Sequence, residues 1–107
     1  MQKSEKPLPQ HKQDFLDWLA VEKGLSSKTQ ENYSRFIKRF FDWLHEKNLN
    51  SLKPHELTAQ HVRDYRLYLS RQSRPKSTEP FKKSTQNYYI IALRALLSHF
   101  SEKEVIS

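Results

Sequence analysis

Hydroxyl, amide and basic side chains gather at two places in the sequence where a helix is expected to begin. The first is segment 24–33 and the second is segment 82–88. The free N–H groups at a helix start point outward and the macrodipole is positive there, so each place suits a bound phosphate. Lys28, Lys82 and Lys83 set cations against that positive end, which is unfavourable unless an anion lies between them. These residues therefore predict contact with a phosphate backbone.

The two places share an order of side chains: a hydroxyl cap, a threonine, an amide and a tyrosine. In the first they are Ser26, Thr29, Asn32 and Tyr33, and in the second Ser84, Thr85, Asn87 and Tyr88. The amides can pair with base edges, most naturally adenine, or they are ordinary first-turn residues that face water. Tyr33 lies on an apolar stripe, so we expect packing to be its main role and phosphate contact a second one.

The candidate nucleic-acid contacts are the donors and cations around these helix starts and on the faces that follow them. They are Ser27, Lys28, Thr29, Asn32, Tyr33, Arg35, Arg39, Lys82, Lys83, Ser84, Thr85, Gln86, Asn87 and Arg94. The charge distribution supports this set. The chain of 107 residues has a net charge of +7, and segment 71–94 holds six lysines and arginines against a single acid, Glu79. Such a concentration is typical of a polyanion binder, although a solvated basic surface that aids solubility is the alternative.

The amino-acid composition excludes several other folds and kinds of site. One glycine argues against an all-β fold and a glycine-rich nucleotide loop, and the lack of cysteine excludes disulfides and thiolate metal sites. No apolar run approaches a membrane span, so we expect a cytoplasmic protein without a membrane partner. No His-x-x-x-His pair occurs, and no carboxylate pair suggests acid–base chemistry, so neither a metal nor a cofactor is expected.

Hydrophobic spacing predicts an all-α fold, a compact antiparallel bundle of four helices at about 9–23, 27–47, 59–72 and 85–101. Gly24 is expected to end the first helix, and Ser26 or Ser27, Thr58 and Ser84 to cap the following three. Leu52 is expected to pack on the core, and 73–81 to form a long basic loop. Residues 1–8 are predicted to be a disordered tail, 9–103 the domain, and 104–107 the start of a linker.

Two motifs resemble the N-terminal SAM-like, or core-binding, domain of tyrosine recombinases (phage integrases). The first comprises Gly24, Leu25, Ser26, Thr29, Tyr33, Phe36, Ile37, Phe40, Trp43 and Leu44, and the second runs from Ser84 to Asn87 and on through Leu93–Phe100. The resemblance covers residues 11–106. Gln30 departs from it, because the family usually has an aliphatic residue there.

The resemblance implies a fragment that binds duplex DNA at a recombination site while a separate C-terminal domain cuts and joins the strands. The second and fourth helices would lie across the major groove, and neighbouring recombinase protomers would touch through these domains on DNA, while the isolated domain would be a monomer. The family's catalytic His-x-x-Arg signature is absent here, so we expect no enzymatic activity of this fragment.

A second hypothesis is a helical protein–protein interaction module whose basic face binds an acidic partner. It predicts that exposed aromatic residues carry the binding, with Trp43, Tyr68 and Phe81 as the candidates. A free-standing helix-turn-helix transcription factor is disfavoured, because the connection before Ser84 is too long for that motif.

Overall fold

The computed structural model describes residues 6–73 and 79–102, and this part of the chain is helical throughout its regular structure. A 3-10 turn, η1 (Leu8–His11), leads into helix α1 (Lys12–Val21), which is followed by α2 (Ser27–Glu46). A second 3-10 turn, η2 (Pro54–Glu56), precedes α3 (Ala59–Ser70), and α4 (Lys83–Glu102) follows. The predicted all-α fold of four helices is confirmed.

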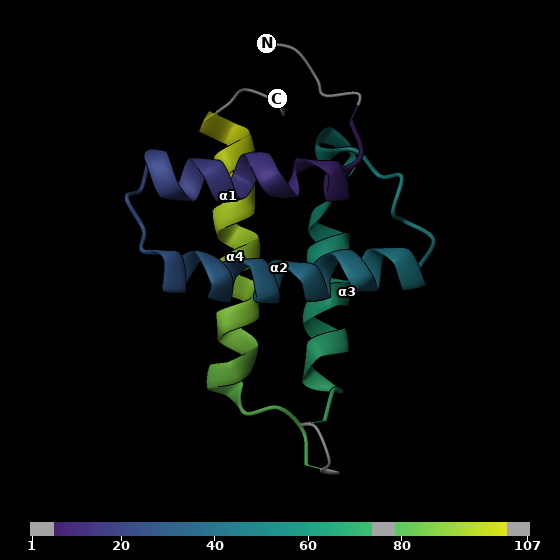
Figure 1. Ribbon diagram of the computed structural model, residues 1–107. Coiled ribbons are helices and arrows are strands. Elements are labelled where there is room, and N and C mark those ends of the chain that lie inside the picture. The colour runs from purple at the N-terminus through teal and green to yellow at the C-terminus, as the bar shows by residue number, and fades with distance from the viewer. Residues whose placement is uncertain (1–5, 74–78, 103–107) are drawn as a thin grey trace.

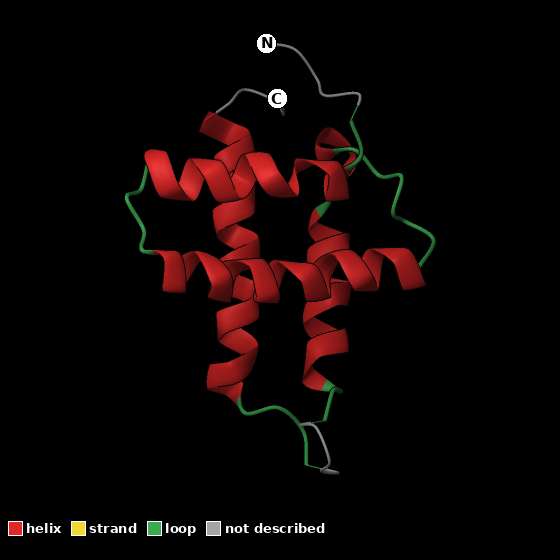
Figure 2. Cartoon of the chain, in the orientation of Figure 1, coloured by secondary structure: helices red, strands yellow, loops and turns green. Residues whose placement is uncertain are grey.

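The helices form two antiparallel pairs that cross one another (Figure 1). In that view α1 and α2 lie in front and run across the molecule, whereas α3 and α4 lie behind and run along it; Figure 2 shows the loops that join them. The prediction of one antiparallel bundle was therefore wrong in its packing. The connection between Val21 and Ser27 is short and reverses the chain directly. The longer connection from α2 to α3 contains η2 and allows the chain to change direction.

Local signals explain the turn between α1 and α2. Gly24 has a φ of 61°, in the left-handed region that glycine adopts without strain. The chain folds back there, and the Leu25 N–H donates to the Leu19 carbonyl at 3.1 Å. Ser26 rather than Ser27 caps α2, because its side-chain oxygen accepts from the Thr29 N–H at 3.3 Å.

The core lies where the two pairs cross, and aromatic rings make up much of it. The fully buried large side chains are Trp43, Tyr65, Phe15, Phe40, Phe100, Leu8, Leu19, Ile37, Leu44, Leu69, Leu93 and Leu96. Phe40 of α2 meets Tyr65 of α3 edge to face, with ring centroids 4.9 Å apart. This burial fixes α2 against the rear pair and so fixes where the exposed face of α2 points. Leu52 packs against this core as predicted.

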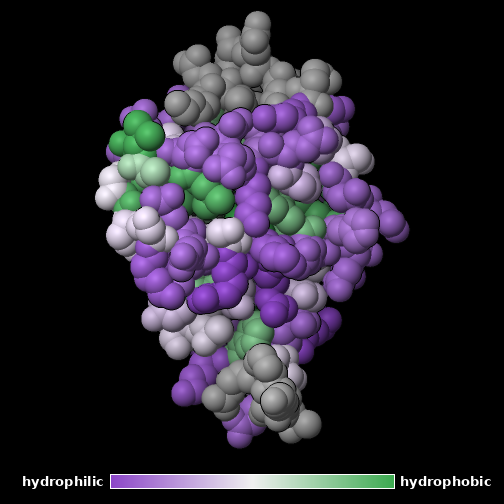
Figure 3. All heavy atoms as spheres, in the orientation of Figure 1, coloured by the Kyte–Doolittle hydropathy of each residue, from purple (hydrophilic) through white to green (hydrophobic). Residues whose placement is uncertain are grey.

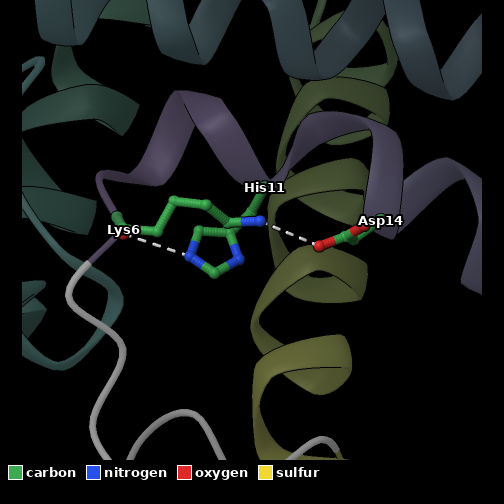
Figure 4. Close-up of polar contacts among 3 residues, drawn as sticks. All are labelled: Lys6, His11 and Asp14. Atoms are coloured by element: carbon green, nitrogen blue, oxygen red, sulfur yellow. Dashed lines mark hydrogen bonds and ion pairs between the residues drawn. The ribbon is translucent and has the colours of Figure 1, made fainter.

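The packed part of the chain begins before the predicted boundary at residue 9. Leu8 is completely buried, and its N–H donates to the Leu52 carbonyl at 2.8 Å. Next to it, the Lys6 ammonium pairs with Asp14 at 3.0 Å, and the Lys6 carbonyl accepts from Nε2 of the buried His11 at 3.1 Å (Figure 4). The predicted tail therefore holds at most for residues 1–5, which, like the predicted linker 104–107, lie outside the described residues.

The ends of α3 and α4 also depart from the prediction. Thr58 caps α3 as predicted, accepting from the His61 N–H at 3.2 Å, but α3 ends at Ser70 rather than near residue 72. Of the predicted loop 73–81, residues 74–78 lie outside the described residues. Its two sides meet, since Ser73 and Pro80 form a β-bridge and the Phe81 N–H donates to the Gln72 carbonyl at 2.9 Å.

Candidate nucleic-acid interface

The starts of α2 and α4 border one groove of about 580 Å³. We call it the α2–α4 groove, and it is lined by Thr29, Asn32, Tyr33, Arg35, Phe36, Thr85, Tyr88, Tyr89 and Ile91. Five of these lining residues were predicted as contacts from the sequence: Thr29, Asn32, Tyr33, Arg35 and Thr85. The fold therefore brings together side chains that lie more than 50 residues apart in the chain. None of the lining residues is acidic.

Helix α4 begins at Lys83, two residues before the predicted start, so Ser84 is its second residue and not its cap. The carbonyl of Lys82 accepts the first helical hydrogen bond, from the Gln86 N–H at 3.0 Å. Lys82 thus occupies the cap position, for which hydroxyl and acidic or amide side chains are usual. The sequence could not show this, because Ser84 is the better cap by residue type.

The two helix starts have the same architecture in a corrected register. Gln30 is the fourth residue of α2, and its amide donates to the Leu25 carbonyl at 2.9 Å. Gln86 is the fourth residue of α4, and its amide donates to the Phe81 carbonyl at 3.0 Å. Each glutamine thus ties its helix start to the preceding loop. Tyr33 therefore corresponds to Tyr89, not to Tyr88 as the sequence pattern indicated.

This register separates Gln86 from the other candidate contacts. Its amide nitrogen is already used by Phe81, and its side chain lines a different groove of about 560 Å³ between α3 and α4. We call this the α3–α4 groove, lined by Ala59, Val62, Arg63, Arg66, Leu67 and Gln86. Gln86 is therefore tied to the loop that precedes α4 and does not line the α2–α4 groove.

Aromatic rings support Arg35 at the edge of the α2–α4 groove. The guanidinium lies over the Phe36 ring, 5.0 Å from its centroid. Phe36 in turn stacks on Tyr88 of α4, with centroids 6.0 Å apart and planes 10° apart, and meets Tyr89 edge to face at 5.0 Å. A cation resting on a ring face is attracted by the ring quadrupole, so this platform favours one position of the arginine. The platform was not predicted, because it joins rings from two helices.

Arg39 is held more firmly than Arg35 and is partly buried. Its guanidinium lies 5.3 Å from the centroids of both Phe81 and Tyr89, and it donates to the Tyr68 hydroxyl at 3.4 Å. Burial acts to lower the pKa of Arg39, but its hydrogen bonds to and charge interactions with Tyr89 and Tyr68 together outweigh burial and place the pKa above its ordinary value. Arg39 therefore supplies a permanent positive charge beneath the surface and also joins α2 to α3 and α4.

The remaining candidates are exposed and do not line the α2–α4 groove. Ser27 and Lys28 begin α2, Lys82, Lys83, Ser84 and Asn87 begin α4, and Arg94 lies further along α4. The Lys28 ammonium is 3.9 Å from the Glu31 carboxylate, and its side chain is 78% exposed. This pair weakens the argument that Lys28 requires an external anion, although exposed pairs of this kind contribute little and exchange readily. Lys82 and Lys83 closely precede Thr85, which does line the groove.

The aromatic residues named for a protein-binding module are not exposed as that hypothesis required. Trp43 is 2% exposed and Phe81 is 7% exposed, so both are part of the interior. Tyr68 is half-buried and packs near Trp43. Among the described residues the exposed large aromatic side chain is Tyr88, which lines the α2–α4 groove. The prediction failed for Trp43 because an amphipathic pattern does not distinguish the middle of a helix face from its edge. It failed for Phe81 because this loop residue packs on Tyr89 and Arg39 from other elements.

The front face of the molecule is largely hydrophilic, with hydrophobic side chains in separate patches (Figure 3). Within the described ranges, no group of His, Cys, Asp and Glu side chains could hold a metal ion. None of the helices described is long and apolar enough to cross a membrane. These features define the class: a small all-α domain with a groove between two helix starts, lined by hydrogen-bond donors, one arginine and several aromatic rings.

The chain belongs to the family of phage integrase N-terminal SAM-like domains, whose family model matches residues 12–107. It is also similar to the tyrosine recombinase XerD of Corynebacterium glutamicum, with 41% identity over 51 residues. That stretch is 48% of this chain and 16% of the relative, so the comparison covers a small part of a longer protein. No solved structure matches the chain. The family and fold expected from the sequence motifs are thus confirmed.

Proposed function

We propose that this domain binds duplex DNA at a recombination site, while a separate C-terminal domain of a tyrosine recombinase cuts and joins the strands. The α2–α4 groove and the exposed lysines beside it form the contact. The observation that carries the proposal is the lining of that groove, which combines donors and an arginine with no acidic side chain. Phosphate contacts of this kind position a duplex, and base edges are read between them.

The charge along α4 supports the same surface. From Pro80 to Ser101 the sequence contains no acidic residue, and Glu102 is the last residue of the helix. The cationic side chains there are Lys82, Lys83 and Arg94, all exposed. A polyanion that approaches the start of α4 therefore meets more positive than negative charge, although Glu79 directly precedes this stretch. As part of the proposal, the fragment has no catalytic role of its own, and other recombinase protomers are its partners on DNA.

The test is a titration of the domain with a fluorescent 20-base-pair duplex at low salt, followed by anisotropy. Lys82→Glu/Lys83→Glu should weaken binding at least tenfold and to the same extent for unrelated sequences, because the lost contacts are to phosphates. The control is Lys12→Glu/Lys47→Glu, which changes the net charge equally where α1 begins and α2 has ended. If both variants weakened binding equally, the loss of affinity would be explained by net charge alone and the proposed contact surface would be wrong. If the domain formed no complex with any duplex, the proposal of DNA binding would be refuted.

The alternative, a protein-binding module with a basic face, retains one favourable observation. Leu67 is 48% exposed and lines a groove of about 430 Å³ together with Lys47, Asp64 and Arg71. An acidic and apolar peptide would suit that surface. Leu67→Ser should abolish binding of such a partner and leave the duplex affinity unchanged, so the same titration separates the two functions.

A further inference from the structure

Two exposed apolar side chains lie in the α2–α4 groove, where the proposed function has given them no role. Tyr88 is 55% exposed and Ile91 is 47% exposed, and they lie three residues apart on one face of α4. The other exposed large apolar residues among those described, Val21 and Leu67, do not line this groove. An apolar patch that is kept exposed beside charged groups commonly marks a contact surface.

The patch has a fixed shape. The Tyr88 ring lies parallel to Phe36, and this contact between α2 and α4 restrains it while more than half of the residue stays accessible. Ile91 is β-branched and sits in the middle of a helix, so its first side-chain torsion is restricted. A ligand group that meets this patch would therefore find it already in place, at little cost in side-chain entropy.

The surroundings indicate what kind of group would meet it. Asn32 and Arg35 of α2 line the same groove as Tyr88 and Ile91 of α4. In the major groove of DNA the bases present hydrogen-bonding edges and one apolar group, the C5-methyl of thymine. A groove that combines an amide and an arginine with two exposed apolar side chains matches that combination. The match includes charge, since no acidic side chain lines the groove.

We propose that Tyr88 and Ile91 form an apolar contact for the C5-methyl group of a pyrimidine in the major groove, which is thymine in unmodified DNA. The inference rests on the proposed duplex binding and adds to it a base preference for A·T pairs. Arg35 and Asn32 would then hold the adjacent backbone and base edge from the α2 side. Direct readout would come mainly from α4 in this arrangement, and Tyr88 and Ile91 would be the specificity-determining residues.

The test compares duplexes that differ only in the methyl group, so that no knowledge of the recombination site is needed. One pair is an alternating A·T duplex of 20 base pairs and the same duplex with 2′-deoxyuridine in place of thymidine. The other pair is an alternating G·C duplex with and without 5-methylcytosine. Burying one methyl-sized group is worth about 0.8 kcal/mol, so the methylated member of each pair should bind about fourfold more tightly.

Matched variants assign the effect to the patch. In Tyr88→Ala/Ile91→Ala the preference for the methylated duplex should fall to about onefold. Ile91→Val keeps a β-branched apolar group and should keep most of the preference. Circular dichroism checks that each variant remains folded; exposed positions on a helix tolerate such changes.

The outcomes are separable. Binding of all four duplexes with no effect of the methyl group would overturn this inference and leave the proposed function standing. No binding to any of them would overturn both. If the double variant kept the methyl preference but lost self-association in sedimentation, the patch would be a protein interface, and the inference would again be overturned.

Discussion

The dependence of duplex affinity on salt gives the sharpest test of the proposed phosphate contacts. Four exposed or rim cations border the α2–α4 groove or begin its two helices: Lys28, Arg35, Lys82 and Lys83. Arg39 is not counted, because its guanidinium is engaged by Tyr68 and by two aromatic rings. Arg94 is not counted either, because it neither lines the groove nor lies at the start of a helix. If each of the four neutralises one phosphate, the log–log slope of the binding constant against salt is about −3.6.

Replacing Lys82 and Lys83 by glutamine removes two of these charges without introducing repulsion. The slope should then fall to about −1.8, because each lost phosphate contact removes about 0.9 from it. Between 50 and 200 mM salt, affinity should drop roughly 150-fold for the unmodified domain and roughly 12-fold for Lys82→Gln/Lys83→Gln. The variant should therefore bind much more weakly at 50 mM and differ less at 200 mM.

Fluorescence anisotropy at five or six salt concentrations measures both slopes. The control is Lys12→Gln/Lys47→Gln, which loses the same net charge away from the groove and should keep a slope near −3.6. The reasoning would be refuted by parallel lines for the unmodified chain and the Lys82/Lys83 variant. Parallel lines would mean that these lysines affect affinity without contacting phosphate.

Three further predictions concern residues whose roles the structure defines. Ser26→Ala should lower the free energy of unfolding by about 1 kcal/mol in urea titrations, because the cap of α2 is lost; Ser27→Ala, which removes no cap, should change it little. Gln86→Ala should lower the free energy of unfolding by about 1 kcal/mol, because the hydrogen bond to the Phe81 carbonyl is lost, and should leave the duplex affinity unchanged. A large loss of duplex affinity would mean that Gln86 contacts DNA. Finally, burial lowers the pKa of His11 below its ordinary 6.5, so the folded state binds fewer protons than the unfolded state at mildly acidic pH. The contribution of His11 to the free energy of unfolding should be fully present above about pH 6.5 and should decline as the pH falls toward 5. This decline lies at higher pH than the one expected from Asp14, whose pKa is lowered from 3.8 by Lys6. Melting temperatures between pH 5 and 7.5 should show the decline, and His11→Gln should flatten it; an undiminished decline in that variant would assign it to another group.

The sequence correctly predicted those features of the fold that depend on only a few neighbouring residues. The left-handed Gly24 and the caps at Ser26 and Thr58 depend on the chemistry of one turn, and each was found where residue type indicated. The start of α4 was misplaced because the same reasoning favours Ser84 over Lys82, whereas the chain begins the helix where Gln86 can reach the Phe81 carbonyl. That contact depends on how the loop before the helix returns from α3, which no local pattern records.

Features of the fold that depend on packing between helices could not be predicted from the sequence pattern. Trp43 and Phe81 looked available because neither is at the centre of an apolar stripe, yet the crossing of the two helix pairs buries both. Leu8 lies in a segment with the composition of a tail, yet its side chain is part of the core and its N–H pairs with the Leu52 carbonyl. The ring platform under Arg35 needs Tyr88 from a helix 50 residues away, so its existence follows from the fold alone.

The corrected register of the two helix starts explains why the α2–α4 groove has two different walls. Each helix places a threonine third and a glutamine fourth, and each glutamine is used to fasten the preceding loop. At the sixth position, however, α2 has Asn32 and α4 has Tyr88. One structural solution for starting a helix is thus used twice, with a polar residue on one wall and an apolar residue on the other. In the proposed complex, Asn32 would meet a base edge and Tyr88 would meet a methyl group, so the two helix starts would contribute different contacts to the same duplex.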